Sequence, residues 1–336
     1  MPLSRRPGEA PGGRRRGSPW TRLGVVVAKE TADHLSGARM VVIEALVFLV
    51  ALVLAWFSTT TIRESIGQSP FLFLRLLTIS PDPIPFSFIG MVGLVTPIIA
   101  IALGFDAINA EFNQRTLSRI LAQPIYRDAL LFGKFLAGLL TITIMLVALW
   151  LMVIGLGILT LGLPPGPEEV MRAVAMLFVT VVYAGVWLAL ALFFSIVFRS
   201  AATAALAALG LWLFLTILWP LIAPFLAALF VSDTVATPAE LLSHLGVMQA
   251  FARVSPGALF GEIVGVLLDP TVRSTQQPLL ASLGLALVQP GSVPGAPLPL
   301  LQSIEVVWPQ IVGMIAGAIF LFVIGYVIFQ RQEVRA

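Results

Sequence analysis

Hydrophobic positions along the chain gather into six long stretches that hold almost no charge. Each has about 18 residues or more, the length that an α-helix needs to cross a hydrocarbon core of about 30 Å. None shows the strict apolar and polar alternation of a lipid-facing barrel strand, so each is expected to be a helix whose backbone hydrogen bonds are internal. The predicted fold class is all-α, a polytopic membrane domain over 40–330 with spans at 40–57, 84–105, 135–163, 173–198, 201–232 and 306–329.

Composition supports a membrane protein and excludes several kinds of site. Of 336 residues, 58% are hydrophobic and 11% are charged, whereas a soluble domain has about 25% charged residues. The chain has no cysteine, which excludes disulfides, thiolate metal sites and cysteine nucleophiles. Two histidines, His34 and His244, are too few for a histidine-rich metal centre. We therefore expect no metal and no cofactor bound by this chain.

The distribution of basic residues predicts the orientation in the membrane. Of the 20 Lys and Arg residues, 15 lie before the first span, in the connections after spans two and four, or after span six. The opposite side has five basic and nine acidic residues. Because cytoplasmic loops carry the excess of Lys and Arg, both termini are predicted to be cytoplasmic in a multi-pass protein of the cell membrane. The basic balance also attracts anionic lipid, and no nucleic-acid-binding pattern accompanies it.

Segments outside the spans have distinct compositions. Residues 1–19 are rich in Arg, Gly and Pro and are predicted to be a disordered basic tail. Residues 20–39 mix apolar and charged positions at helical spacing, which indicates an amphipathic helix on the inner membrane surface. In the exterior loop 233–305, Ser255 and Pro256 predict the start of a short outer helix. That helix either packs on the bundle as a lid or contacts a substrate.

Motifs for membrane-embedded catalysis and for nucleotide binding are missing. There is no H-E-x-x-H and no G-x-S-x-G sequence, and Glu44, near the cytoplasmic end of span one, is the lone acid inside a span. We see no inverted three-plus-three repeat of the kind that many ion-driven transporters have. Gly133-Lys134 is followed by Phe135 and is not a phosphate-binding loop.

The connection between spans two and three has a more regular pattern than a simple link needs. Glu111, Arg115 and Arg119 recur at every fourth position and form one charged helical face. Pro124 ends this helix, and the chain becomes helical again near Arg127. Spacing alone allows two interpretations: a helix resting on lipid, or a helix that presents its charged face to a partner protein.

The sequence GFDAINAEFNQRTLSRILAQPIYRDALLFGKFLAG resembles the stretch after the second span in ABC transporter permeases of the ABC type-2 class. The shared features are an acidic residue, a Thr-Leu pair, a Gln-Pro turn followed by Arg, and a Gly-Lys pair. The resemblance implies that 111–124 is a coupling helix which contacts an ATPase subunit. Its implied contact residues are Glu111, Arg115, Thr116, Leu117, Arg119, Gln123, Pro124 and Arg127.

The resemblance implies a permease subunit, and an exporter, with no catalysis of its own. ATP and Mg would be bound by a soluble ATP-binding cassette subunit, and a second permease subunit, identical or paralogous, would complete the transporter. The alternatives are a membrane anchor or assembly scaffold without transport, or a secondary transporter or membrane-embedded enzyme. The substrate stays open, although aromatic and small residues in spans five and six fit an apolar or amphiphilic path. Gly313 and Gly317 indicate close helix packing.

Cysteine labelling tests the predicted orientation, because the native chain contributes no background thiol. A cysteine at Ser232 or Thr275 is expected to react with an impermeant thiol reagent from outside the cell. A cysteine at Ser118 is expected to react only after permeabilisation. Labelling of position 118 in intact cells would reverse the orientation derived from the basic residues.

Overall fold

The computed structural model describes residues 23–64, 71–113, 127–231, 238–277 and 297–331. All the regular structure in these ranges is helical, which confirms the all-α prediction. Six helical segments are long and apolar enough to cross a membrane, as expected for a polytopic protein. They are α2 (Ala38–Glu64), α4 (Phe88–Gly104) with its continuation to Glu111, α7 (Arg127–Leu161), α8 (Pro167–Val197), the segment α9 (Ala201–Leu213), η1 (Phe214–Leu218) and α10 (Trp219–Ala228), and α14 (Leu300–Arg331).

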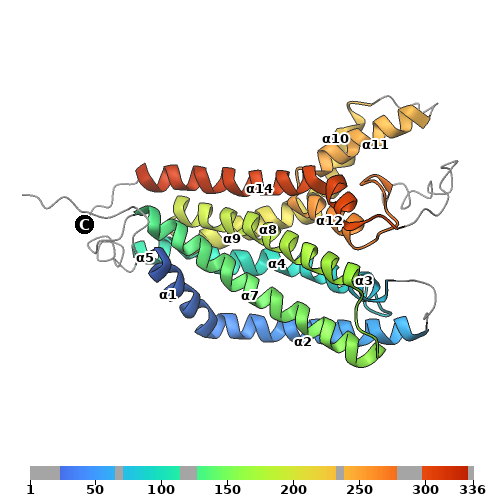
Figure 1. The fold of residues 1–336 in the computed structure, drawn as a ribbon. Coiled ribbons are helices and arrows are strands. Elements are labelled where there is room, and N and C mark those ends of the chain that lie inside the picture. The colour runs from blue at the N-terminus through green and yellow to red at the C-terminus, as the bar shows by residue number, and fades with distance from the viewer. Residues whose placement is uncertain (1–22, 65–70, 114–126, 232–237, 278–296, 332–336) are drawn as a thin grey trace, which may run out of the picture.

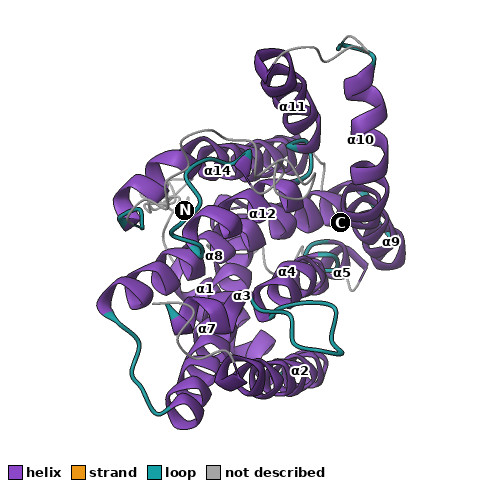
Figure 2. Ribbon diagram, turned by 90° about the vertical axis from the view of Figure 1, so that its right-hand side faces the viewer, coloured by secondary structure: helices purple, strands orange, loops and turns teal. Residues whose placement is uncertain are grey.

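The long helices lie side by side in one bundle (Figure 1). One end of the bundle has α1 (Leu23–Ser36) and α5 (Asn109–Asn113), and the other end has α3 (Leu72–Thr78) and α12 (Pro256–Leu267). The predicted orientation makes the first of these the cytoplasmic end, so we call them the inner end and the outer end. In Figure 2, α10 and α11 (Pro238–Ala252) form a hairpin that projects from the bundle.

Helix α8 is the central element of the bundle. In its most apolar stretch 67% of the residues are buried, against 61% in α4 and 11% in the segment from α9 to α10. Small residues allow α4 and α8 to approach closely: a Cβ added at Gly104 would lie 2.7 Å from the Cβ of Ala191. Close approach through small residues is the usual basis of helix packing in lipid.

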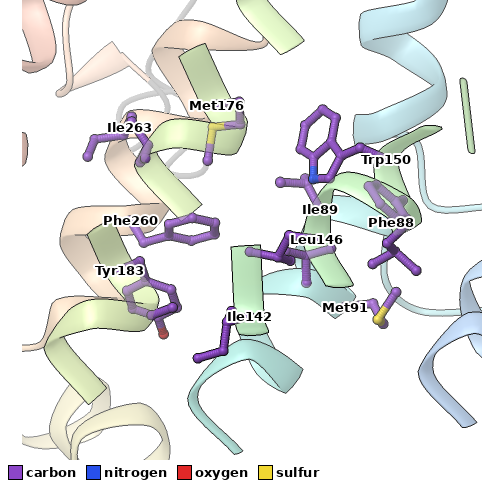
Figure 3. Close-up of a cluster of buried hydrophobic side chains, with 14 of the residues drawn as sticks. Phe88, Ile89, Met91, Ile142, Leu146, Trp150, Met176, Tyr183, Phe260 and Ile263 are labelled. Carbon is purple, nitrogen blue, oxygen red and sulfur yellow. The ribbon is translucent and has the colours of Figure 1, made fainter. Parts of the chain in front are cut away.

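Aromatic and branched side chains fill the space between α4, α7, α8 and α12 (Figure 3). Phe88 meets Trp150 edge to face, with ring centroids 5.7 Å apart. Tyr183 stacks on Phe260 of α12 at 4.5 Å. Such pairs add about 0.5–1.5 kcal/mol beyond the area that they bury. The short helix α12 is therefore packed on the bundle through one of its faces.

Local signals in the sequence account for several helix starts. The side chain of Ser87 accepts a hydrogen bond from the Gly90 N–H at 3.2 Å at the start of α4. Helix α12 begins at Pro256, where the sequence places its start, but the Ser255 side chain makes no capping hydrogen bond. Instead, the Ser255 carbonyl oxygen accepts from the N–H of Ala258 at 3.1 Å.

Span five is interrupted by one π-helical turn, η1. Pro220 has no N–H, so it cannot donate the α-helical bond to the carbonyl of Thr216. The N–H of Trp219 bonds to the carbonyl of Phe214, five residues earlier, which accommodates one extra residue in the turn. The extra residue changes the rotational setting of α10 relative to α9.

A buried arginine fastens the outer end. The guanidinium of Arg172 in α8 is fully buried and donates to Glu168 at 3.0 Å, to the Leu267 carbonyl at 2.8 Å and to Ser303 at 3.2 Å. It also donates to the carbonyl of Leu298. These acceptors join α8 to the end of α12 and the start of α14. A buried cation is tolerated when its donors are matched in this way.

Helix α3, too short to cross the membrane, is held beside Arg172. The backbone N–H of Phe73 donates to Glu169 Oε1 at 2.8 Å, while the other carboxylate oxygen of Glu169 accepts from the Gly166 N–H at 2.7 Å. Four apolar side chains of α3 are buried: Phe73, Leu74, Leu76 and Leu77. One glutamate thus caps α8 and positions α3.

The close approach of α4 and α8 can be tested by adding one methyl group. Gly104→Ala would force the helices apart and is expected to lower the free energy of unfolding by about 1–3 kcal/mol. Gly155→Ala in α7 is the matched control, because a Cβ there meets no atom within 4 Å, and it is expected to be neutral or slightly stabilising. Unfolding by sodium dodecyl sulfate in mixed micelles measures both; equal stabilities would contradict the packing described.

Candidate functional site

A buried ion cluster connects three elements at the inner end. The Nζ of Lys134, in α7, lies 2.8 Å from Glu111 Oε1 in α5 and 2.9 Å from Glu30 Oε2 in α1. The side chains are 7%, 14% and 15% exposed, respectively. We call Glu30, Glu111 and Lys134 the inner triad. It ties the first turn of the predicted coupling segment to two other helices.

The inner triad depends on the charge of its lysine. Burial alone would raise the pKa of Glu30, but the positive charge of Lys134 and its hydrogen bond outweigh burial, so the pKa lies below its ordinary value. Glu30 is consequently ionised at neutral pH. Without the ammonium group, two partly buried carboxylates would be left close together, which is strongly unfavourable.

Gly133, next to the lysine, sets the distance between α1 and α7. A Cβ at this position would lie 2.5 Å from Cγ1 of Val26 in α1, closer than real side chains approach. The glycine lets the two helices touch, and the next residue, Lys134, then reaches Glu30. Both residues of the Gly-Lys pair therefore act at the contact between α1 and α7: Gly133 leaves room for it, and Lys134 adds an ion pair.

The start of α5 is also fixed to α8. Ser195 Oγ accepts hydrogen bonds from the backbone N–H groups of Ile108 at 3.0 Å and Asn109 at 3.3 Å. At the other end of α5, the side-chain amide of Asn113 donates to the carbonyl of Arg199 at 3.0 Å. Since Ile108 and Asn109 are buried, the segment after span two starts from a rigid base.

Two further contacts link the inner ends of the remaining spans. Arg39, in α2, pairs with Asp106 at 3.1 Å and lies over the ring of Phe105 at 5.2 Å. Asp128, in α7, accepts from the hydroxyl of Tyr326 at 3.0 Å and from the side-chain amide of Gln330, both in α14. A displacement of the segment between α4 and α7 would therefore act on several helices together.

Comparison with known proteins agrees with this architecture. A family model described as ABC-2 family transporter protein matches residues 25–334. The chain belongs to this family. The probable ABC transporter permease protein NosY of Pseudomonas aeruginosa is 29% identical over 211 residues, which cover 60% of this chain and 68% of that protein. The chain is thus a permease subunit of an ABC transporter and a multi-pass membrane protein.

The structure of this ABC-2 permease describes part of the predicted coupling segment. Glu111 lies in α5, and Arg127 is the first residue of α7, where the sequence predicts that the helix resumes. The other predicted contact residues lie outside the described residues; they are Arg115, Thr116, Leu117, Arg119, Gln123 and Pro124. Because Glu111 is bonded to Lys134, it contributes to the base of the segment inside the permease.

The two glycines predicted for helix packing have different surroundings in α14. A Cβ at Gly313 would lie 3.8 Å from Cδ1 of Leu259 in α12, which is ordinary contact. A Cβ at Gly317 would meet no atom within 4 Å among the described residues. Close packing at Gly317 stays a prediction.

Sequence reasoning did not single out Glu30 or Ser195 as parts of the site. A signal existed for Glu30, because a lysine at the start of an apolar span needs a counter-ion and the helix before span one has few acids that could supply it. No such signal in the sequence pointed to Ser195, since a serine inside a span more often bonds the backbone of its own helix. Here its hydroxyl accepts from the segment that follows α4.

The inner triad predicts a specific acid sensitivity. Because the folded pKa of Glu30 is depressed, its stabilising contribution is complete above its unfolded pKa of about 4.5 and is lost as pH falls through the lower folded value. We expect the thermal midpoint of the wild type to fall more steeply below about pH 4.5 than that of Glu30→Gln, which is less stable at neutral pH. Asp33→Asn, a change at the exposed pair with Lys29, is the control and should follow the wild type. Parallel curves for wild type and Glu30→Gln would contradict the triad.

Proposed function

We propose that this permease subunit exports its substrate across the cell membrane with energy from ATP that a separate soluble subunit hydrolyses with Mg. A second permease subunit, a copy of this chain or a paralogue, completes the pathway. The observation that carries the proposal is the attachment of the segment after span two: its first turn is bonded to α1 and α7 by the inner triad and to α8 by Ser195. An element that only rested on lipid would not need this attachment.

The attachment provides a route for mechanical coupling. When the ATPase subunits close on nucleotide, they press on segment 111–124, which has its base in α5. Lys134 transfers the displacement to α7 and α1, and Ser195 transfers it to α8. Helices α7 and α8 continue to the outer end. There Arg172 of α8 holds α12 and α14. Movement at the inner end is thereby communicated to the outer end without a contact between nucleotide and substrate.

The exposure of span five supports a second permease subunit. Large apolar side chains point away from the bundle along this segment: Leu206 is 72% exposed and Phe225 is 76% exposed. In a membrane they face lipid or the apolar surface of another subunit. Span five has the smallest buried share of the six spans in the part of the chain that the structure describes, so it is the proposed face for pairing.

Reversal of two charges tests the coupling role. In the proposal Arg115 and Arg119 bind the ATPase subunit, and Arg115→Glu with Arg119→Glu is expected to lower its affinity by about 30-fold or more, because a reversed interfacial charge costs about 2–5 kcal/mol. The reversed protein should still insert into the membrane. Recovery of the ATPase subunit with affinity-purified permease, at equal expression, is the measurement.

The matched control reverses two charges elsewhere on the same side. Arg331→Glu with Arg335→Glu changes the net charge equally, at and beyond the end of α14, and should leave recovery of the ATPase subunit unchanged. If the segment only rests on anionic lipid, each arginine contributes about 1 kcal/mol of surface attraction, and neither double variant would lose the subunit. That result would favour the anchor or scaffold alternative.

A further inference from the structure

Two adjoining cavities lie towards the outer end of the bundle. The larger, about 510 Å³, is lined by residues of α4, α8, η1, α10, α11 and α12 and is open on one side, and we call it the apolar chamber. The smaller, about 370 Å³, lies between α10, α11 and α12, and we call it the outer chamber. Four residues line both chambers: Pro220, Ala252, Ala258 and Gly261. The chambers are therefore parts of one site, within the size range of pockets that hold small organic ligands.

The apolar chamber offers little to a polar ligand. Its wall includes Ile89, Leu215 and Phe260. The polar groups of Tyr183 and Trp219 are already used: the Tyr183 hydroxyl donates to the Gly93 carbonyl at 3.2 Å, and the Trp219 indole N–H donates to the Phe251 carbonyl at 2.8 Å. This chamber suits a hydrocarbon chain.

One hydroxyl group in this chamber has no bond of its own. Thr216 Oγ1 lies in the π-helical turn η1, is enclosed, and has no hydrogen-bond partner among the residues that the structure describes. Buried hydroxyl groups are normally satisfied, because an unmade bond costs free energy. A hydrocarbon chain in this chamber would not compete for this hydroxyl, so the buried group gives the chamber no preference for a polar ligand.

The outer chamber ends in a polar network. Glu262, which lines it, accepts three hydrogen bonds from Arg253, at 3.0, 3.1 and 2.9 Å, and one from Gln310 at 2.7 Å. Arg253 also donates to Thr275 Oγ1 at 3.2 Å, and Thr275 lines the same chamber. A guanidinium and a carboxylate thus lie side by side at fixed positions. Charges of both signs suit a polar head that is zwitterionic or a hydrogen-bonding neutral group.

We propose that the two chambers bind a single-chain amphiphile, with its hydrocarbon chain in the apolar chamber and its polar head in the outer chamber. The wall formed by η1 and α10 belongs to the least buried span, which is also the proposed pairing face, so a ligand can enter where the two subunits would face each other. This inference rests on the proposed function, because it takes the bound amphiphile to be of the same chemical class as the exported substrate. The same chemistry is also offered by one chain of a membrane phospholipid, and the experiment separates the two sources.

Gly261 provides a way to fill the site. It lies on the wall shared by both chambers, and a Cβ there would meet no atom within 4 Å. A large side chain at this position enters the open space without forcing the backbone to move. Gly210, in α9, is the matched control, because a Cβ there also meets no atom within 4 Å and the residue is not part of either chamber.

The experiment uses native mass spectrometry of the full chain, purified in phosphatidylcholine nanodiscs and titrated with lysophosphatidylcholine that has a 12-carbon chain. Wild type and Gly210→Phe are expected to bind one probe molecule, and Gly261→Phe none. Thr216→Val, which keeps the shape of the wall, should bind the probe as tightly as the wild type, because a hydrocarbon chain forms no hydrogen bond with the Thr216 hydroxyl. Ala258→Leu, on the same wall, replaces Gly261→Phe if that variant does not accumulate.

The bound mass identifies the source of the ligand. A lysophospholipid adduct that the filling variant abolishes, and that Gly210→Phe keeps, supports a site for free single-chain amphiphiles. A phospholipid adduct with the same dependence places a bilayer lipid in the site and overturns the single-chain assignment. Equal adducts on wild type and on the filling variant, or none on any variant, overturn the site itself.

The outcome is separable from the proposed function. Binding of the probe needs no ATPase subunit, so a specific adduct without recovery of that subunit would keep the site and remove the transporter proposal. Recovery of the ATPase subunit by a permease that binds no probe would keep the transporter proposal and remove the site.

Discussion

Assembly of the inner end depends on one buried ammonium group. Lys134 lies where a membrane helix begins, and its charge is acceptable there because Glu30 and Glu111 lie within 2.9 Å. These carboxylates come from a helix before the first span and from the segment after the second. The requirement to neutralise one charge thus brings three distant pieces of sequence together, and Gly133 supplies the close approach that makes the distance possible.

A second ionic fastening lies at the opposite end of the same bundle. Arg172 occupies the first turns of α8 and Ser195 its last turn, and 23 residues at about 1.5 Å each put them about 35 Å apart. The first side chain holds α12 and α14, and the second holds the start of α5. Helix α8 is also one of the most buried spans. Because α8 is held by hydrogen bonds near both of its ends, a displacement of its inner end would also move the helices bound at its outer end.

The sequence was sufficient for the features that depend on local composition. Hydropathy predicts the six spans, and Ser255-Pro256 marks the start of α12, because both follow from a few adjacent residues. The ion pairs could not be predicted from the sequence, because Lys134 and Glu30 are 104 positions apart and no periodicity links them. Nor does any spacing link Glu111 to Lys134, which it binds. Pro220 indicates a disturbance in span five, but not the extra residue of η1.

That extra residue divides span five into two halves with separate rotational phases. One residue of an α-helix corresponds to a rotation of about 100°, so the apolar stripe of α9 and that of α10 need not face the same way. In the structure α9 packs against α8, and α10 packs against α11. A single-residue deletion within Phe214–Leu218 would restore a continuous stripe and swing the α10–α11 hairpin around the bundle axis. The length of this one turn therefore determines which surface the hairpin presents at this end of the bundle.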